Sequence, residues 1–242
     1  MVYHGYENGF RTLGRQALLE PVEWTKDGWL RAKGGTLSAP LAKPRGGHAS
    51  PAGLALSDDF SSGKLGLQWA FHAPGPDESA RVRFEKPGSL VLRGKGNALA
   101  DCSPLCCNAG DRSYEISVEI EVSGDAHGGL ALFYDERGHA GMAFSSKGQM
   151  LTYGYGQEQS WMREPIAPGK SVHIRLVNRE NVLTLHHSRD GGKTWQQHPW
   201  QMEVSGFHHN VFGGFLSLRP ALFCAGNGEL RARNFVYRGL ST

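Results

Sequence analysis

A strict alternation of apolar and polar residues over 114–122, with the sequence YEISVEIEV, constrains the fold of this chain more than any other feature. The apolar positions are Tyr114, Ile116, Val118, Ile120 and Val122, and the polar positions between them are Glu115, Ser117, Glu119 and Glu121. Because successive side chains of a β-strand point to opposite faces, the two sets lie on opposite faces of a strand. The segment predicts a strand with one buried face and one solvated face.

Segments of the same kind recur along the rest of the chain. They are SLVLRG, GGLALFYD, GMAFSS, QMLTYGY, SVHIRLVN, VLTLHHS, GGFLSLRP and ELRARNFVYR. Polar stretches such as SSKG, NREN and RDGGK separate them, and no segment has the period of a helix. Closely spaced strands with turn residues between them predict an all-β fold, a two-sheet antiparallel sandwich with more strands than an immunoglobulin domain.

The composition and the net charge indicate which classes of binding partner are not expected. The 242 residues are 39% hydrophobic and 20% charged, which is ordinary for a globular protein. The net charge is only +3 and the basic residues are scattered, so we expect no nucleic-acid partner. We expect no membrane partner either, because no apolar run reaches the roughly 18 residues of a membrane helix. The first twenty residues lack the order of a signal peptide, so the expected location is cytoplasmic.

The cysteines are expected to be free. Cys102, Cys106, Cys107 and Cys224 could form two disulfides, but reduced thiols are the default inside a cell. The cluster CSPLCC has neither CxxC spacing nor nearby paired histidines, so a zinc site is not expected.

The composition changes along the chain and predicts three regions. Residues 31–57 are rich in Gly, Pro, Ala and Ser and have no helix or strand period, as a linker does. This linker separates a head, residues 1–30, from a β-rich body, residues 58–242.

The stretch SRDGGKTW, residues 188–195, fits the Asp-box pattern. Asp190 is expected to accept hydrogen bonds from the turn amides, and Trp195 to pack back on the hairpin. This is a folding device more than a functional site. The neighbouring His186 and His187 are expected at the surface or at an edge, and adjacent residues of a strand cannot share a face to bind a metal.

Two parts of the sequence carry a resemblance to a known family. The head, YHGYENGFRTLGRQALLEPVEWTKDGW, resembles the last blade of the five-bladed propeller in bacterial β-xylosidases and α-L-arabinofuranosidases of glycoside hydrolase family 43. In the body, LSDDFSSGKLGLQWAF, CSPLCCNAGDRSYEISVEIEV and NVFGGFLSLRPALFCAGNGELRARNFVYR resemble the concanavalin A-like domain that follows the propeller. The resemblance implies a concanavalin A-like antiparallel β-sandwich of the jelly-roll type, preceded by an orphan propeller-blade segment.

The resemblance also implies an activity for a longer enzyme. The family removes terminal xylose or arabinose units from hemicellulose with inversion, which requires two carboxyl groups roughly 6.5–9.5 Å apart. The family's Asp, Asp and Glu belong to earlier blades, so no catalytic residue is expected in this chain. Arg15, in TLGRQ, matches the arginine that contacts the sugar in the −1 subsite, although it could instead form an ion pair that stabilises the blade. His4 and Arg11 lie in the same strand region and could line the pocket.

The head raises the question of a partner. A single blade cannot close a propeller, so its apolar face is expected to pack on its own sandwich or on a second chain. Two further alternatives are a truncated glycoside hydrolase and a split enzyme, in which another polypeptide supplies the missing propeller blades.

Three functions are compatible with the sandwich, and the favoured one is an accessory domain that supports the propeller and the mouth of its active site. The second is a module that binds xylo- or arabino-oligosaccharides through an aromatic platform. Its candidates are Tyr153, Tyr155, Trp161, Trp69 and His72. The third is catalysis by the chain itself through Glu119 and Glu121, which are more simply explained as a solvated outer face.

No cofactor is expected apart from a candidate structural Ca²⁺. Sandwiches of this class often hold one near their terminal strands, and Asp58, Asp59 and Asn234 are the candidate ligands.

Overall fold

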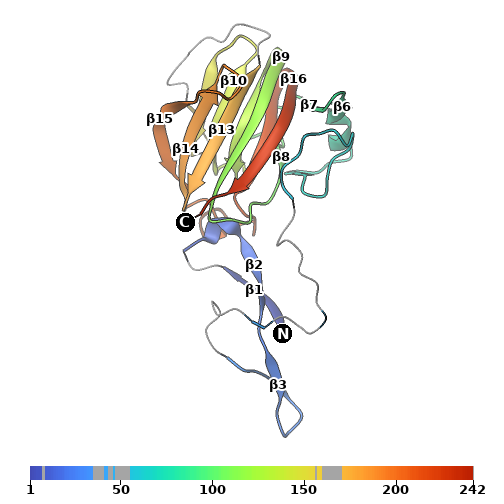
Figure 1. The fold of residues 1–242 in the computed structure, drawn as a ribbon, viewed down its shortest axis with the longest axis vertical. Helices are drawn as coiled ribbons and strands as arrows, with labels where there is room; N and C mark the ends of the chain where they lie inside the picture. Colours follow the sequence, from blue (N-terminus) through green and yellow to red (C-terminus); the bar gives the residue numbers. More distant parts are fainter. Residues whose placement is uncertain are drawn as a thin grey trace.

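The computed structural model describes residues 1–6, 9–34, 41–42, 46, 55–155, 157–159 and 171–241, with the backbone alone for 157–159. A large β-sandwich forms one end of the molecule, and two small hairpins extend from its lower edge (Figure 1). Within the described residues, no helix has the length and apolar character needed to cross a membrane.

The two hairpins form the head. Strands β1 (Val2–Tyr6) and β2 (Arg15–Leu19) pair antiparallel, with the 3-10 helix η1 (Arg11–Leu13) between them. Strands β3 (Val22–Trp24) and β4 (Leu30–Ala32) form the second hairpin. The second hairpin therefore continues to residue 32, just beyond the start of the predicted linker.

The sandwich contains the remaining strands. They are β5 (Ala70–Phe71), β6 (Val82–Glu85), β7 (Ser89–Arg93), β8 (Leu105–Cys106), β9 (Ser113–Phe133), β10 (His139–Ser145), β11 (Met150–Gly154), β12 (Gln157–Gln159), β13 (Val172–Arg179), β14 (Val182–Ser188), β15 (Gln196–Glu203) and β16 (Arg219–Gly239). The described helical turns of the sandwich are η2 (Glu78–Arg81) and α1 (His209–Phe212).

Strands β9 and β16 run side by side through both layers (Figure 1). The first half of β9 pairs with β13, which continues the sheet to β14 and β15, and its second half pairs with β10, which continues it to β11 and β12. Likewise, β16 pairs with β7 through residues 229–232 and with β8 through residues 221–222. Strands β9 and β16 thus form one long two-stranded ribbon, and each half of this ribbon belongs to a different layer. The sheets are open.

Glycines allow the two long strands to change direction together. Gly124 and Gly226 both have positive φ, 74° and 92°, which costs glycine little. A Cβ on Gly124 would lie 2.8 Å from the carbonyl oxygen of Asn227, so the close approach of the strands also requires glycine there.

The predicted alternation of 114–122 is confirmed. Ile116, Val118 and Ile120 are almost completely buried between the layers, where each contributes about 1.5–3 kcal/mol. The glutamates between them lie on the outer face.

The second half of β9 is buried on both faces. Leu130 and Leu132 join the core between the layers, whereas Ala131 and Phe133 belong to a second apolar cluster on the opposite face. The stretch that contains Leu99 and Cys102 covers that face. All four cysteines are free and buried, as expected.

Candidate functional site

The junction between the head and the sandwich brings Arg15 onto an exposed aromatic ring. The guanidinium carbon of Arg15, the first residue of β2, lies 4.1 Å from the ring centroid of Phe215 and 5.7 Å from that of Tyr6. Phe215 belongs to the loop between α1 and β16 and is 58% exposed. An arginine in this position offers its remaining N–H groups to a ligand while its face rests on the ring.

The loop holds Phe215 in an uncommon conformation. Gly213, Gly214 and Phe215 all have positive φ, at 79°, 82° and 56°. A bulky residue in this region is strained, and the strain persists only where the surroundings fix it. Here the amide of Phe215 donates to Nδ1 of His209 at 3.2 Å, and the two rings stack with centroids 3.7 Å apart.

Two further hydrogen bonds tie this loop to the end of β9. The Tyr134 hydroxyl donates to the carbonyl of Gly213, and Arg137 donates to the carbonyl of Phe212. Arg137 is itself held by the Asp135 carboxylate at 2.6 Å, which raises the pKa of the guanidinium. The ring of Phe215 is therefore presented on a fixed support.

The same end of the sandwich binds the head. The Thr12 hydroxyl donates to Oδ1 of Asn181 at 2.7 Å in a buried contact, and the amide of Leu218 donates to the Thr12 carbonyl at 2.7 Å. Arg112 lies 4.6 Å from the ring centroid of Phe10. The head thus packs on its own sandwich through residues 10–15, one of the two expected arrangements.

The other two candidate residues of the head, His4 and Arg11, lie in different elements, β1 and η1. His4 faces Ala17 in the β1–β2 register, and Arg15 faces Tyr6, so His4 and Arg15 share one face of the hairpin. Arg11 lies exposed in η1 on the side of His208, whose pKa is lowered by burial and by the charge of Arg11.

Within the described residues, the structure does not assemble the predicted aromatic platform. Trp69 is buried, donates from Nε1 to Asp58 at 3.0 Å and packs edge-on against Phe235, and Tyr153 is buried in the second apolar cluster. Neither ring has a free face on which a sugar could stack, which corrects the expectation for both.

The remaining platform residues do not replace them. Tyr155 is exposed and packs edge-on against Phe207. His72 is fixed between Arg219, which donates to its Nδ1 at 2.8 Å, and Glu136 at 3.1 Å from its Nε2. Trp161 lies outside the described residues.

The candidate calcium ligands do come together, but they do not fit the ion. Asp58, Asp59 and Asn234 line one shallow hollow. The Asp58 oxygens already accept hydrogen bonds from the Phe60 amide and the Trp69 indole, and Asp59 accepts from the Ser61 amide. Calcium needs 6–8 oxygen ligands. Moreover, the described residues contain no group of three His, Cys, Asp or Glu side chains that could hold a metal.

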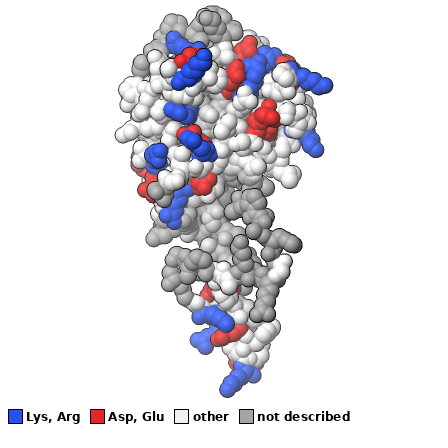
Figure 2. Space-filling view, in the orientation of Figure 1, with Lys and Arg blue, Asp and Glu red and all other residues white. Residues whose placement is uncertain are grey.

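Glu119 and Glu121 lie in a row of ion pairs on the outer face of the sandwich. Arg233 contacts Glu119 at 3.2 Å, and Arg231 contacts Glu121 at 3.3 Å. Acidic and basic side chains are interspersed over this face (Figure 2). Both carboxylates are thus engaged in ion pairs with guanidinium groups of β16. The surroundings therefore support the interpretation of a solvated face.

The Asp-box turn has the expected hydrogen bonds. Oδ1 of Asp190 accepts from the amides of Lys193 and Thr194, and Oδ2 accepts from the Thr194 hydroxyl at 2.6 Å. The expectation for His187 is wrong, because its ring is buried beside Phe144.

Comparison with known proteins identifies the family. Residues 57–236 match the family model of the β-xylosidase C-terminal concanavalin A-like domain. The chain belongs to this family.

The chain is also similar to longer proteins, among them glycoside hydrolases of family 43. The chain is 27% identical to a non-reducing end α-L-arabinofuranosidase of Bacteroides ovatus, over 91% of the chain and 43% of the relative. A family 43 protein of Bacillus licheniformis has a similar fold, with a TM-score of 0.79 at 20% identity, over 99% of the chain and 50% of the relative. A xylan β-1,4-xylosidase of Bacillus halodurans also has a similar fold, with a TM-score of 0.77 at 23% identity, over 94% of the chain and 48% of the relative. The domain and its head thus span about half the length of these relatives.

The sequence analysis named Arg15 as a candidate site residue but did not name Phe215, which lies against it. The segment GGFLSLRP resembles a strand, yet β16 begins only at Arg219. The adjacent Gly213 and Gly214 were the available signal, since paired glycines before an aromatic residue are typical of a tight loop.

Proposed function

We propose that this chain is the accessory, C-terminal part of a family 43 glycoside hydrolase that acts on xylo- or arabino-oligosaccharides of hemicellulose. Its sandwich supports the propeller, and the loop that carries Phe215 forms one wall of the active-site mouth. The contact between Arg15 and Phe215 carries this proposal. It joins the arginine assigned by resemblance to the sugar subsite with an exposed ring held by the sandwich.

The energetics of the loop agree with this role. A strained aromatic residue that is more than half exposed gains little stability from its position. The faces of this ring are taken by His209 and by the Arg15 guanidinium, so its exposed edge adds apolar surface to the wall while the remaining N–H groups of Arg15 donate hydrogen bonds to sugar hydroxyls. The catalytic acid and base are supplied by propeller blades outside this chain.

Several apolar side chains of the head are exposed, which is typical of strands that pack against a partner. Leu19, Trp24, Trp29 and Leu30 are between 58% and 73% exposed. Apolar side chains exposed next to unpaired strand edges favour association. In the proposal they pack against further propeller strands, which the same polypeptide or a second one provides.

The test is hydrolysis of p-nitrophenyl β-D-xyloside and p-nitrophenyl α-L-arabinofuranoside by the purified chain. We expect no turnover by the chain alone. A separately produced polypeptide with the preceding propeller blades should bind the chain in sedimentation experiments, and Trp24→Ser should weaken that association. Turnover by the chain alone would contradict the accessory role, because a carboxyl pair within these residues would then perform the hydrolysis.

A further inference from the structure

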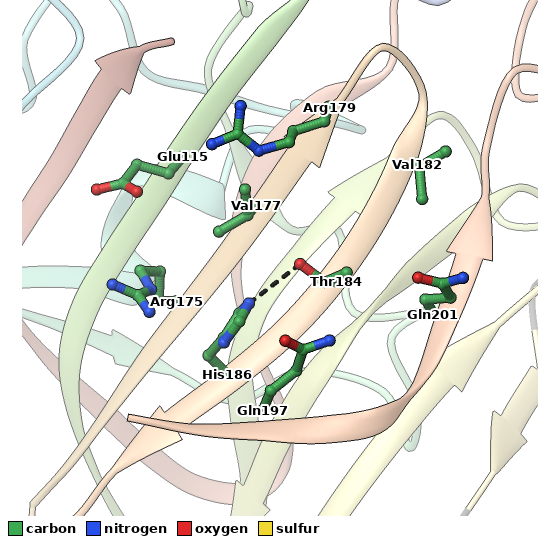
Figure 3. Close-up of a pocket in the computed structure, with 9 residues that line it drawn as sticks. All are labelled: Glu115, Arg175, Val177, Arg179, Val182, Thr184, His186, Gln197 and Gln201. Atoms are coloured by element: carbon green, nitrogen blue, oxygen red, sulfur yellow. Dashed lines mark hydrogen bonds between the residues drawn. The ribbon is translucent and has the colours of Figure 1, made fainter. Parts of the chain in front are cut away.

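A polar groove with a volume of about 460 Å³ lies on the outer face of β13, β14 and β15 (Figure 3). Two guanidinium groups, from Arg175 and Arg179, lie on its β9 side, and two amides, from Gln197 and Gln201, lie on its β15 side. Neighbouring strands are about 4.8 Å apart, so the three strands span about 10 Å. This width suits a chain of sugar rings lying on the sheet.

The two arginines of the groove differ from the other arginines of this face. Arg231, Arg233 and Arg238 each form ion pairs with glutamates, and Glu115 in the groove is engaged by Arg238 at 2.8 Å. Among the described residues, neither Arg175 nor Arg179 has a carboxylate within ion-pair distance, and Nε of Arg175 is buried without an acceptor. Neither cation therefore forms an ion pair within this part of the protein, and the one carboxylate in the groove, that of Glu115, is engaged by Arg238.

The Arg175 guanidinium is nevertheless held in place. Its carbon lies 4.3 Å from the ring centroid of Trp195, at the end of the Asp-box turn. Stacking on an indole restricts the side chain and leaves the edge of its planar fork available to a carboxylate. The Asp-box thus positions a cation at the edge of the groove.

The remainder of the groove is neutral and offers both donors and acceptors. Oγ1 of Thr184 and Nε2 of His186 are 3.0 Å apart and share a hydrogen bond (Figure 3). Burial and the charge of Arg175 lower the pKa of His186, so its imidazole is uncharged near pH 7. Each glutamine amide provides a donor and an acceptor, which match sugar hydroxyls. Val177 and Val182 add an apolar surface for sugar C–H groups.

We propose that this groove binds an oligosaccharide that carries a carboxylate, as a uronic acid unit does. The carboxylate lies toward the two guanidinium groups, and the sugar hydroxyls lie toward the amides of β15. The inference goes beyond the accessory role proposed above and stands on the groove alone.

The experiment is an NMR titration of the ¹⁵N-labelled full chain with a xylotriose that carries one glucuronic acid unit. The neutral comparison is xylotetraose, and the second comparison is free glucuronate. We expect the acidic oligosaccharide to shift amide signals of β13, β14 and β15 and to bind at least about fivefold more tightly than either comparison, because hydrogen bonds to charged groups are the stronger ones.

Two variants and a matched control locate the site. Arg179 is exposed, so Arg179→Ala should preserve the fold and weaken binding about tenfold. Gln201→Ala should weaken the acidic and the neutral oligosaccharide alike. Arg93→Ala removes an exposed arginine of β7, outside the groove, and should leave binding unchanged.

Any one of five results would overturn the proposal. Signals that shift only outside β13–β15, or no shifts at millimolar ligand, would show that the groove does not bind this class of ligand. Equal binding of xylotetraose would remove the role of the arginines. Equal binding of free glucuronate, or equal weakening of binding in Arg93→Ala, would show that the acidic oligosaccharide is held only by general charge attraction.

Discussion

The guanidinium of Arg15 lies over the ring of Phe215, with 4.1 Å between the guanidinium carbon and the ring centroid, although the two residues come from opposite ends of the chain. The contact depends on both halves of the molecule. The head positions Arg15 at the start of β2, and the sandwich fixes the loop that carries Phe215. An interaction of this kind couples the head to the sandwich at the place where we propose that sugar binds.

Removing the ring should free Arg15 with a modest loss of stability. The interaction of an exposed arginine with an aromatic ring is worth about 0.5–1 kcal/mol. The stacking of Phe215 on His209 is worth about 0.5–1.5 kcal/mol, so Phe215→Ala should lower the free energy of unfolding by no more than about 2.5 kcal/mol. The Nε–H signal of Arg15 should lose its ring-current shift, and Phe215→Tyr should preserve it. An unchanged Arg15 signal in Phe215→Ala would show that the two residues are not in contact in solution.

The buried hydrogen bond between Thr12 and Asn181 should hold the head on the sandwich. Thr12→Val keeps the shape of the side chain but leaves Oδ1 of Asn181 without its donor, which costs about 1–3 kcal/mol. We expect faster proteolysis within residues 1–34 while the sandwich remains folded. Ser62→Ala removes an exposed hydroxyl within the sandwich, which donates to the Lys64 carbonyl, and is the control. Equal proteolysis of the wild type and Thr12→Val would contradict this role.

The alternation of residues 114–122 predicted the sandwich and the inward face of β9 correctly. An alternation of apolar and polar residues shows which residues share a face of a strand, but it does not show what covers that face. Tyr153 is buried because the stretch with Leu99 and Cys102 covers the outer face of the second layer, and this covering comes from residues distant in sequence. The aromatic platform therefore could not be tested by periodicity.

The candidate sites show the same limit. Arg15 was named as a candidate from its local motif. Phe215 could be named only from the structure, where Gly213 and Gly214, both with positive φ, precede it in a loop. The groove depends on the strand order β13–β14–β15, which places Arg175 near Gln197 and Gln201. A spacing along the sequence does not contain that order.

Cys106 should make the protein less stable in alkali. Burial raises the pKa of its thiol to about 11 from 9.0. Above pH 9 the unfolded chain loses this proton while the folded chain retains it, so the stability contribution is complete below pH 9 and disappears as the pH rises toward 11. The loss reaches about 3 kcal/mol for this one group. Urea unfolding at pH 7, 9 and 10 should show a steeper decline in the wild type than in Cys106→Ala, and parallel declines would contradict the assignment.

Asp190 should stabilise the Asp-box turn only while it is ionised. Hydrogen bonds from the Thr194 hydroxyl, the Thr194 amide and the Ser188 hydroxyl, in that order of size, lower the pKa of this carboxyl well below its usual 3.8. A carboxyl with a depressed pKa in the folded state contributes stability above the pKa of the unfolded chain and loses it as the pH falls through the folded pKa.

Asp190→Asn keeps an acceptor in the turn but cannot ionise. Its Tm should be lower than that of the wild type at pH 7, and the difference should shrink as the pH falls below 3.8. Asp190→Ala should have the lower Tm of the two variants at neutral pH, because the amides of Lys193 and Thr194 lose their acceptor. Arg175 rests on Trp195 at the end of this turn, so both variants should also weaken binding in the groove. A constant difference in Tm between the wild type and Asp190→Asn from pH 7 to pH 2 would show that the charge of Asp190 does not stabilise the turn.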